Sequence, residues 1–237
     1  CSSIGKKLIM SLSGLFLVIF LTLHAGLNAC AIISKELYDM VCVFMDTNPL
    51  VQIMVPVLAA GFVVHILYAL WLGASNLNAR PREMKYAVAN KTKATSWASK
   101  NMLVLGFIVL GALAIHLFHF WSKMQLQHFI GGEGENAYEL IVKLFSCPCW
   151  SIFYVAWFAA IYYHVSHGFW SAFQTIGLSN SNWIPRLQII ARIYGGVLFL
   201  IYVALPILVM CGCVTCDVAC DGGECVIEAV EEVAPAL

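Results

Sequence analysis

The residues best suited to do chemistry in this chain are histidines that lie inside apolar segments. His164 and His167 lie in the stretch Ala159–Gly177, and no charged residue occurs between Lys143 and Arg186. Burying a histidine in a membrane segment is costly unless another group takes up its ring nitrogen, so such a residue indicates a functional site. An imidazole nitrogen also binds metals. The histidines are therefore the first candidates for a site.

The composition is that of an integral membrane protein. Of the 237 residues, 61% are hydrophobic and only 11% are charged, and the mean hydropathy is +0.84. An ordinary soluble domain has about 45–50% apolar and about 25% charged residues. The net charge is zero and the basic residues are scattered, which excludes the basic stripe of a nucleic-acid-binding protein.

Five apolar segments, charged only at Arg192 near the start of the last one, are long enough to cross a hydrocarbon core of about 30 Å, which takes about 20 helical residues. The first is too long for a signal peptide and is predicted to be a retained span. Backbone groups in lipid must be satisfied internally, so the segments are predicted to be helices. The fold class expected is an all-α integral membrane protein, with a five-helix transmembrane domain over residues 1–213 and a Cys-rich, acidic, extracytoplasmic tail over residues 214–237. The five predicted spans are Leu8–Ile33, Leu50–Ala74, Met102–Trp121, Cys149–Phe173 and Ile189–Cys213.

The distribution of lysine and arginine predicts the orientation, because cytoplasmic loops carry an excess of both. The ends predicted to be cytoplasmic carry Lys6, Lys7, Arg80, Arg82, Lys85, Lys91, Lys93, Lys100, Arg186 and Arg192. The opposite loops carry only Lys35, Lys123 and Lys143, mixed with six carboxylates. The N-terminus is therefore predicted to be cytoplasmic and the C-terminus to be outside.

Each of the first four predicted helices carries a histidine about 16 or 17 residues after its N-terminal boundary, a travel of about 24 Å. These residues are His24, His65, His116 and His164. Because consecutive helices run in opposite directions, His24 and His116 are expected near the outer face, and His65 and His164 near the inner face.

Two imidazoles facing each other at one depth are what a six-coordinate haem iron needs, and iron without a free position suits electron transfer. Gly61 and Gly168 lie one turn from His65 and His164 on the same helix faces, and they would leave room for a flat macrocycle. Small residues also serve helix packing in membranes. His119 and His167 could replace His116 and His164, but the depth match favours the latter two.

Four motifs resemble the dihaem cytochrome b membrane anchor (b558-type) of succinate:quinone oxidoreductases, the succinate dehydrogenases and quinol:fumarate reductases. The resemblance covers nearly the whole chain. The motifs are SGLFLVIFLTLH (Ser13–His24), His65 followed by NARPRE (Asn78–Glu83), HLFHFW (His116–Trp121) and HVSHGFWSAFQTIG (His164–Gly177). In the last of these, the family's H-x-x-x-G pattern selects His164 and Gly168.

The resemblance implies two haems b. His65 and His164 would bind the proximal haem, nearer the cytoplasmic subunits, and His24 and His116 the distal one. It implies a flavoprotein subunit and an iron–sulfur subunit as partners, a bacterial inner (cytoplasmic) membrane location, and a quinone such as menaquinone as substrate. It also allows the complex of this chain with its two partner subunits to form a higher oligomer. This chain would carry electrons between the iron–sulfur subunit and the quinone and would contain no dicarboxylate site. Both directions of the reaction of the whole complex, succinate oxidation and fumarate reduction, fit the sequence.

An acidic residue at the outer end of the first loop exchanges protons with menaquinone in some members of the family. Glu36, Asp39 and Asp46 are the candidates here, although solvated loop carboxylates are the plainer interpretation. Other members have a glutamate two residues before the histidine of the fourth helix, where this chain has Tyr162. His128, in the outer loop, is expected to be solvated.

The tail cluster Cys211–Cys225 holds five of the ten cysteines. Disulfides or subunit contacts are favoured over a soft-metal site. Three other functions remain open for the chain: another dihaem cytochrome b such as a b561-like reductase, a metal-ion transporter, and an anchor without haem. A transporter would need one continuous path of ligands, whereas the histidines form two levels.

Overall fold

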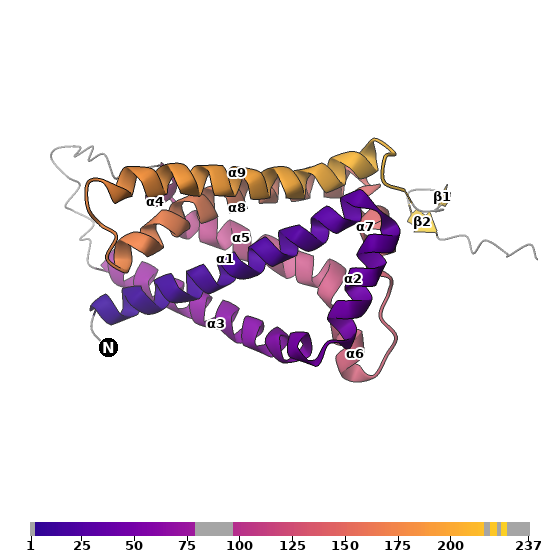
Figure 1. Ribbon diagram of the computed structural model, residues 1–237, viewed down its shortest axis with the longest axis horizontal. Coiled ribbons are helices and arrows are strands. Elements are labelled where there is room, and N and C mark those ends of the chain that lie inside the picture. The colour runs from indigo at the N-terminus through magenta and orange to yellow at the C-terminus, as the bar shows by residue number, and fades with distance from the viewer. Residues whose placement is uncertain (1–2, 79–96, 216–218, 222–223, 227–237) are drawn as a thin grey trace, which may run out of the picture.

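The computed structural model describes residues 3–78, 97–215, 219–221 and 224–226. Across these residues the protein is helical apart from one short hairpin (Figure 1). The long helices are α1 (Ser3–Ile33), α3 (Pro49–Asn78), α5 (Met102–His116, continued by a π-helical segment over Leu117–Trp121), α8 (Pro148–Thr175) and α9 (Trp183–Met210).

Four of these helices, α1, α3, α9 and the continuous α5 segment, are long and apolar enough to cross a membrane by themselves. α8 qualifies only together with the short helix α7 (Ala137–Phe145), to which it is joined at an angle of 101°. Tyrosine, tryptophan and histidine residues lower the hydropathy of α8. The structure thus confirms a helical protein with four or five helices able to span a membrane.

The long helices extend beyond the predicted spans at their charged ends. α1 begins at Ser3 and includes Lys6 and Lys7, and α9 begins at Trp183 and includes Arg186. The predicted boundaries were set by these charges, but a lysine or arginine continues a helix while its charged group reaches toward water.

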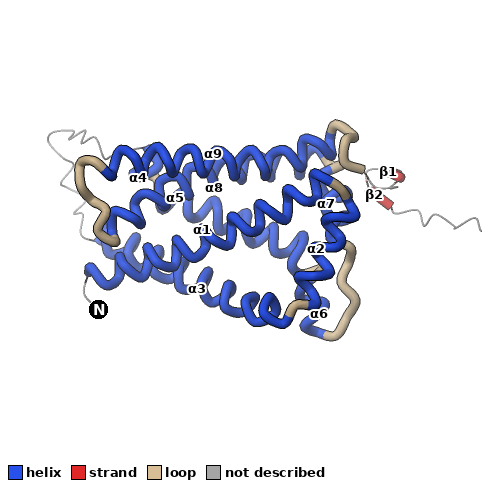
Figure 2. The backbone as a smooth tube through the Cα atoms, in the orientation of Figure 1, coloured by secondary structure: helices blue, strands red, loops and turns tan. Residues whose placement is uncertain are grey.

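The connections gather at two ends of the bundle (Figure 2). One end holds α2 (Lys35–Thr47), α6 (Gln125–Ile130) and α7, which were not predicted; the other holds the N-terminus and α4 (Trp97–Lys100). α2 begins where the Ser34 hydroxyl accepts the backbone N–H of Leu37 at 3.1 Å, an N-terminal cap. The outer loop predicted between the first two spans is therefore largely a helix.

The core lies between α1, α8 and α9. α8 packs most extensively against α9, and α1 packs against α3, α8 and α9. Tyr154 and Leu205, each 1% exposed, belong to the main buried cluster. The hydroxyl of Tyr202 in α9 donates to the Leu21 carbonyl of α1 at 2.8 Å. This hydrogen bond fixes the rotation of α9 about its axis relative to α1.

Candidate functional site

His24 and His116 face each other near the end of the bundle that carries α2 and α7. His24 lies in the second half of α1 and His116 is the last residue of α5. Their ring centroids are 5.9 Å apart and their planes meet at 76°. Phe20 stacks on His24 at 5.5 Å, and Trp157 lies 5.5 Å from His116. Aromatic rings thus surround this pair.

His65 and His164 form a second pair toward the opposite end, in the second halves of α3 and α8. Their centroids are 6.3 Å apart and their planes meet at 70°. Between the two pairs, Phe20 packs edge-on against Phe62, one turn before His65, at 6.1 Å. The structure therefore brings together the same residues that the depth argument paired, at two separate levels.

The helices that carry each pair do not pack closely against each other. α1 and α5, which hold His24 and His116, are not among the closely packed helix pairs of the described structure, and neither are α3 and α8. Over its described positions 49–76, α3 contains no fully buried residue. The imidazoles therefore meet across the interior from helices that stand apart, rather than at a tight helix interface.

The separation within each pair suits one metal centre between two imidazoles. A first-row metal such as zinc binds an imidazole nitrogen at about 2.0–2.1 Å, and the ring centroid lies about 1.1 Å behind that nitrogen, so opposed imidazoles on one metal have centroids about 6.3 Å apart. The observed values are 5.9 and 6.3 Å. Nδ1 of His116 and Nδ1 of His164, like Nδ1 of His167, are buried without a hydrogen-bond partner in the described residues.

The two alternative histidines, His119 and His167, contact other aromatic residues. His119 lies in the π-helical segment, and its Nδ1 is 3.0 Å from the hydroxyl of Tyr154. His167 packs edge-on against Trp170 at 5.0 Å, and its Nδ1 is buried without a partner in the described structure. Neither residue makes a ring contact with His24 or His65 among the described residues.

Gly61 and Gly168 have different surroundings. A Cβ on Gly61 would lie 2.5 Å from Cε1 of Phe16, so this glycine permits close packing of α1 on α3. A Cβ on Gly168 would make ordinary contact with Cε of Met102 at 3.7 Å. The space beside Gly61 is thus occupied by a phenylalanine ring, which favours the helix-packing interpretation for this position.

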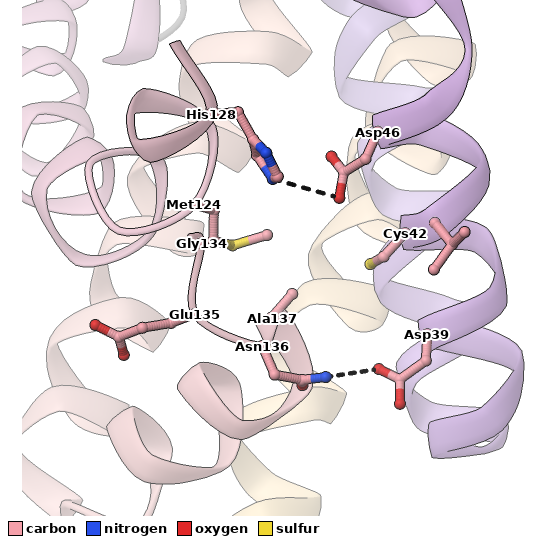
Figure 3. Close-up of a pocket in the computed structure, with 10 residues that line it drawn as sticks. Asp39, Cys42, Asp46, Met124, His128, Gly134, Glu135, Asn136 and Ala137 are labelled. Atoms are coloured by element: carbon pink, nitrogen blue, oxygen red, sulfur yellow. Dashed lines mark hydrogen bonds and ion pairs between the residues drawn. The ribbon is translucent and has the colours of Figure 1, made fainter. Parts of the chain in front are cut away.

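Two of the three carboxylates considered for quinone chemistry, Asp39 and Asp46, line one cavity (Figure 3). The cavity, of about 290 Å³, lies between α2 and the segment from α6 to α7. An Asp46 carboxylate oxygen is 3.8 Å from Nε2 of His128, and the Asn136 amide donates to Asp39 at 3.3 Å. The side chain of His128, expected to be solvated, is 49% exposed and lies beside Asp46. Glu36 lies in the first turn of α2.

Burial raises the pKa of the Cys42 thiol, which lines the same cavity, to about 11. Burial also raises the pKa of the neighbouring Tyr38. Both groups are therefore protonated at neutral pH.

Several sequence predictions fall on residues about which the structure says little. The basic residues from Arg80 to Lys93 and most of the NARPRE motif lie outside the described residues, as does Cys216. Cys211 and Cys213 are exposed and free. The hairpin strands β1 (Ala219–Asp221) and β2 (Glu224–Val226) are antiparallel, with Cys220 opposite Cys225 in register.

No group of three or more histidine, cysteine, aspartate or glutamate side chains suited to a metal ion is present in the described part of the chain. The histidines instead form two pairs. Comparison with protein-family models, with curated proteins and with solved structures finds no match.

Proposed function

We propose that this protein is a dihaem cytochrome b that transfers electrons within a membrane. The observation that supports it most directly is the pair of facing histidines at each of two levels, carried by four different helices. His24 and His116 would hold one haem b, and His65 and His164 the other. Two axial imidazoles leave the iron no open position, which suits electron transfer.

The residues around His24 and His116 would keep water away from a metal centre held by this pair. Phe20 covers His24, Trp157 lies against His116, and Tyr202 of α9 lies 5.9 Å from His24. When bound, each haem supplies an iron that takes up or releases one electron. An apolar shell helps to set the potential at which it does so.

The narrower proposal is the membrane-anchor subunit of a succinate:quinone oxidoreductase, and it rests on the four sequence motifs. In that function a soluble flavoprotein and an iron–sulfur protein bind the end that carries Lys6, Lys7, Lys100 and Arg186. That end would be cytoplasmic, in agreement with its basic residues. The quinone would exchange electrons with the chain, and Asp39 and Asp46 are candidates to exchange protons with it.

The test of haem binding is a reduced-minus-oxidised absorption spectrum of the purified chain with pyridine-haemochrome quantification. The expected result is two haems b per chain, with one lost in His24→Ala and one lost in His65→Ala. His128→Ala serves as a control because this histidine lies at the surface and pairs with Asp46; it should keep both haems. A wild-type chain that binds no haem would exclude the electron-transfer function.

A second experiment separates the succinate:quinone anchor from a self-sufficient dihaem cytochrome such as a b561-like reductase. Both would give the same haem stoichiometry, so spectra do not distinguish them. Purification from the native membrane in mild detergent should bring down a flavoprotein and an iron–sulfur protein in equal amounts. A chain that carries two haems and purifies alone, while accepting electrons from ascorbate, would support the other cytochrome.

A further inference from the structure

The ring of His65 is held against α1 by two adjacent residues, Ser13 and Gly14. Oγ of Ser13 lies 3.3 Å from Nδ1 of His65. A Cβ on Gly14 would be 3.3 Å from Cε1 and 3.6 Å from Nδ1 of the same ring. A hydroxyl group and bare backbone thus contact one edge of the imidazole, and the centroid of the His164 ring lies 6.3 Å from that of His65.

The hydrogen bonds around Ser13 decide which ring nitrogen carries the proton. The Ser13 hydroxyl donates to the carbonyl of Met10 at 3.1 Å, which uses its single hydrogen. With that hydrogen engaged, the Ser13 oxygen is free to accept from Nδ1 of His65 at 3.3 Å, which favours the tautomer protonated at Nδ1. Nε2 keeps its lone pair and is the nitrogen left to bind a metal.

His164 and His116 differ from His65 in this respect. Nδ1 of His164, in the same pair, and Nδ1 of His116, in the other pair, are buried without a partner in the described residues. A metal-binding histidine usually donates its second N–H to an acceptor, which fixes the ring and makes the bound nitrogen more basic. His65 has such an acceptor in Ser13.

We propose that Ser13 is a positioning residue for His65, fixing its tautomer and lowering the reduction potential of the haem between His65 and His164. This inference rests on the proposed haem binding. A more basic axial nitrogen stabilises the oxidised iron over the reduced iron, so the hydrogen bond lowers the potential of that haem. In the described structure the side-chain hydrogen bonds of Ser13 are with Met10 and His65 and not with the other pair, so the potential of the other haem should not respond.

The test is a redox titration of the purified wild-type chain and of Ser13→Ala, followed by the absorbance of each haem. His65→Ala identifies the haem that belongs to the His65 pair. In Ser13→Ala, the midpoint potential of this haem should move to a more positive value, and the potential of the other haem should stay where it is. Ser13→Thr keeps the hydroxyl and should restore the wild-type value.

Ser166→Ala is the matched control. Ser166 lies two residues from His164, and its hydroxyl is buried against Gly195 without a partner in the described structure. Its removal should leave both potentials unchanged. Unchanged potentials in Ser13→Ala, an equal shift of both haems, or the same shift in Ser166→Ala would each overturn the inference. These outcomes differ from failure of the proposed function, in which the wild-type chain would carry no haem to titrate.

Discussion

Replacing Gly61 by alanine separates two explanations of why a glycine lies one turn before His65. A Cβ at this position would lie 2.5 Å from Cε1 and 2.8 Å from Cδ1 of Phe16. Favourable contacts between carbon atoms lie at about 3.5–4.0 Å, so the phenylalanine ring would have to move by about 1 Å. Gly61→Ala therefore pushes α1 and α3 apart or displaces the ring of Phe16.

Gly26→Ala on α1 supplies the reference, because a Cβ there meets no atom within 4 Å. Alanine in place of glycine in a helix interior stabilises by about 0.5–1 kcal/mol. Overpacking costs about 1–3 kcal/mol, so the two variants should differ by about that amount. At about 2–4 °C per kcal/mol for a chain of this size, the difference in Tm is about 2–12 °C.

The assay is thermal unfolding of the detergent-solubilised variants, with haem content measured in parallel. In a Phe16→Ala background, Gly61→Ala should no longer lower the stability, because the ring that the new methyl group meets is gone; a double-mutant cycle gives the coupling. Equal Tm values for Gly61→Ala and Gly26→Ala would refute the reasoning. Loss of one haem that Phe16→Ala does not restore would instead assign Gly61 to haem packing.

Two further predictions concern the end of the bundle that carries α2. The thiolate is the reactive form of cysteine, and burial raises the pKa of the Cys42 thiol to about 11. The rate of alkylation of Cys42, measured by mass spectrometry, should therefore rise about tenfold per pH unit between pH 8 and 10. A rate that reaches a plateau by pH 9 would contradict this. Tyr154→Phe keeps the ring but removes the hydroxyl that lies 3.0 Å from Nδ1 of His119. This loss should cost about 1–3 kcal/mol of stability and lower the Tm. Tyr163→Phe is the control: this tyrosine is 47% exposed, and its substitution should leave the Tm nearly unchanged.

The long helices were predictable because hydrophobicity over about 20 residues is a strong signal and lipid permits few alternatives. The pairing of the histidines was predictable for a related reason. An α-helix rises by a fixed 1.5 Å per residue, so equal distances along two helices that enter from the same membrane face give equal depths. His24 and His116, and His65 and His164, needed no information on side-chain packing to be paired.

Other features depend on contacts between residues far apart in sequence, which local patterns do not reveal. The contact of Ser13 with His65 spans 52 positions and requires a particular rotation of α1 against α3. The π-helical segment after His116 places His119 against Tyr154 of another helix. α2 did have a local signal in Ser34, a good helix-capping residue, followed by Glu36 in the first turn.

The proposed haem binding would account for the sparse packing of α3 against the other helices. This helix is among the most apolar of the chain, but it contributes no fully buried residue over positions 49–76. Its main neighbour is α1, and its contact with α5 is slight. A haem between His65 and His164 would join α3 to α8 through the metal and would cover apolar surface on both helices. Because a ligand that binds only the folded state stabilises it, haem binding and the docking of α3 are expected to support each other.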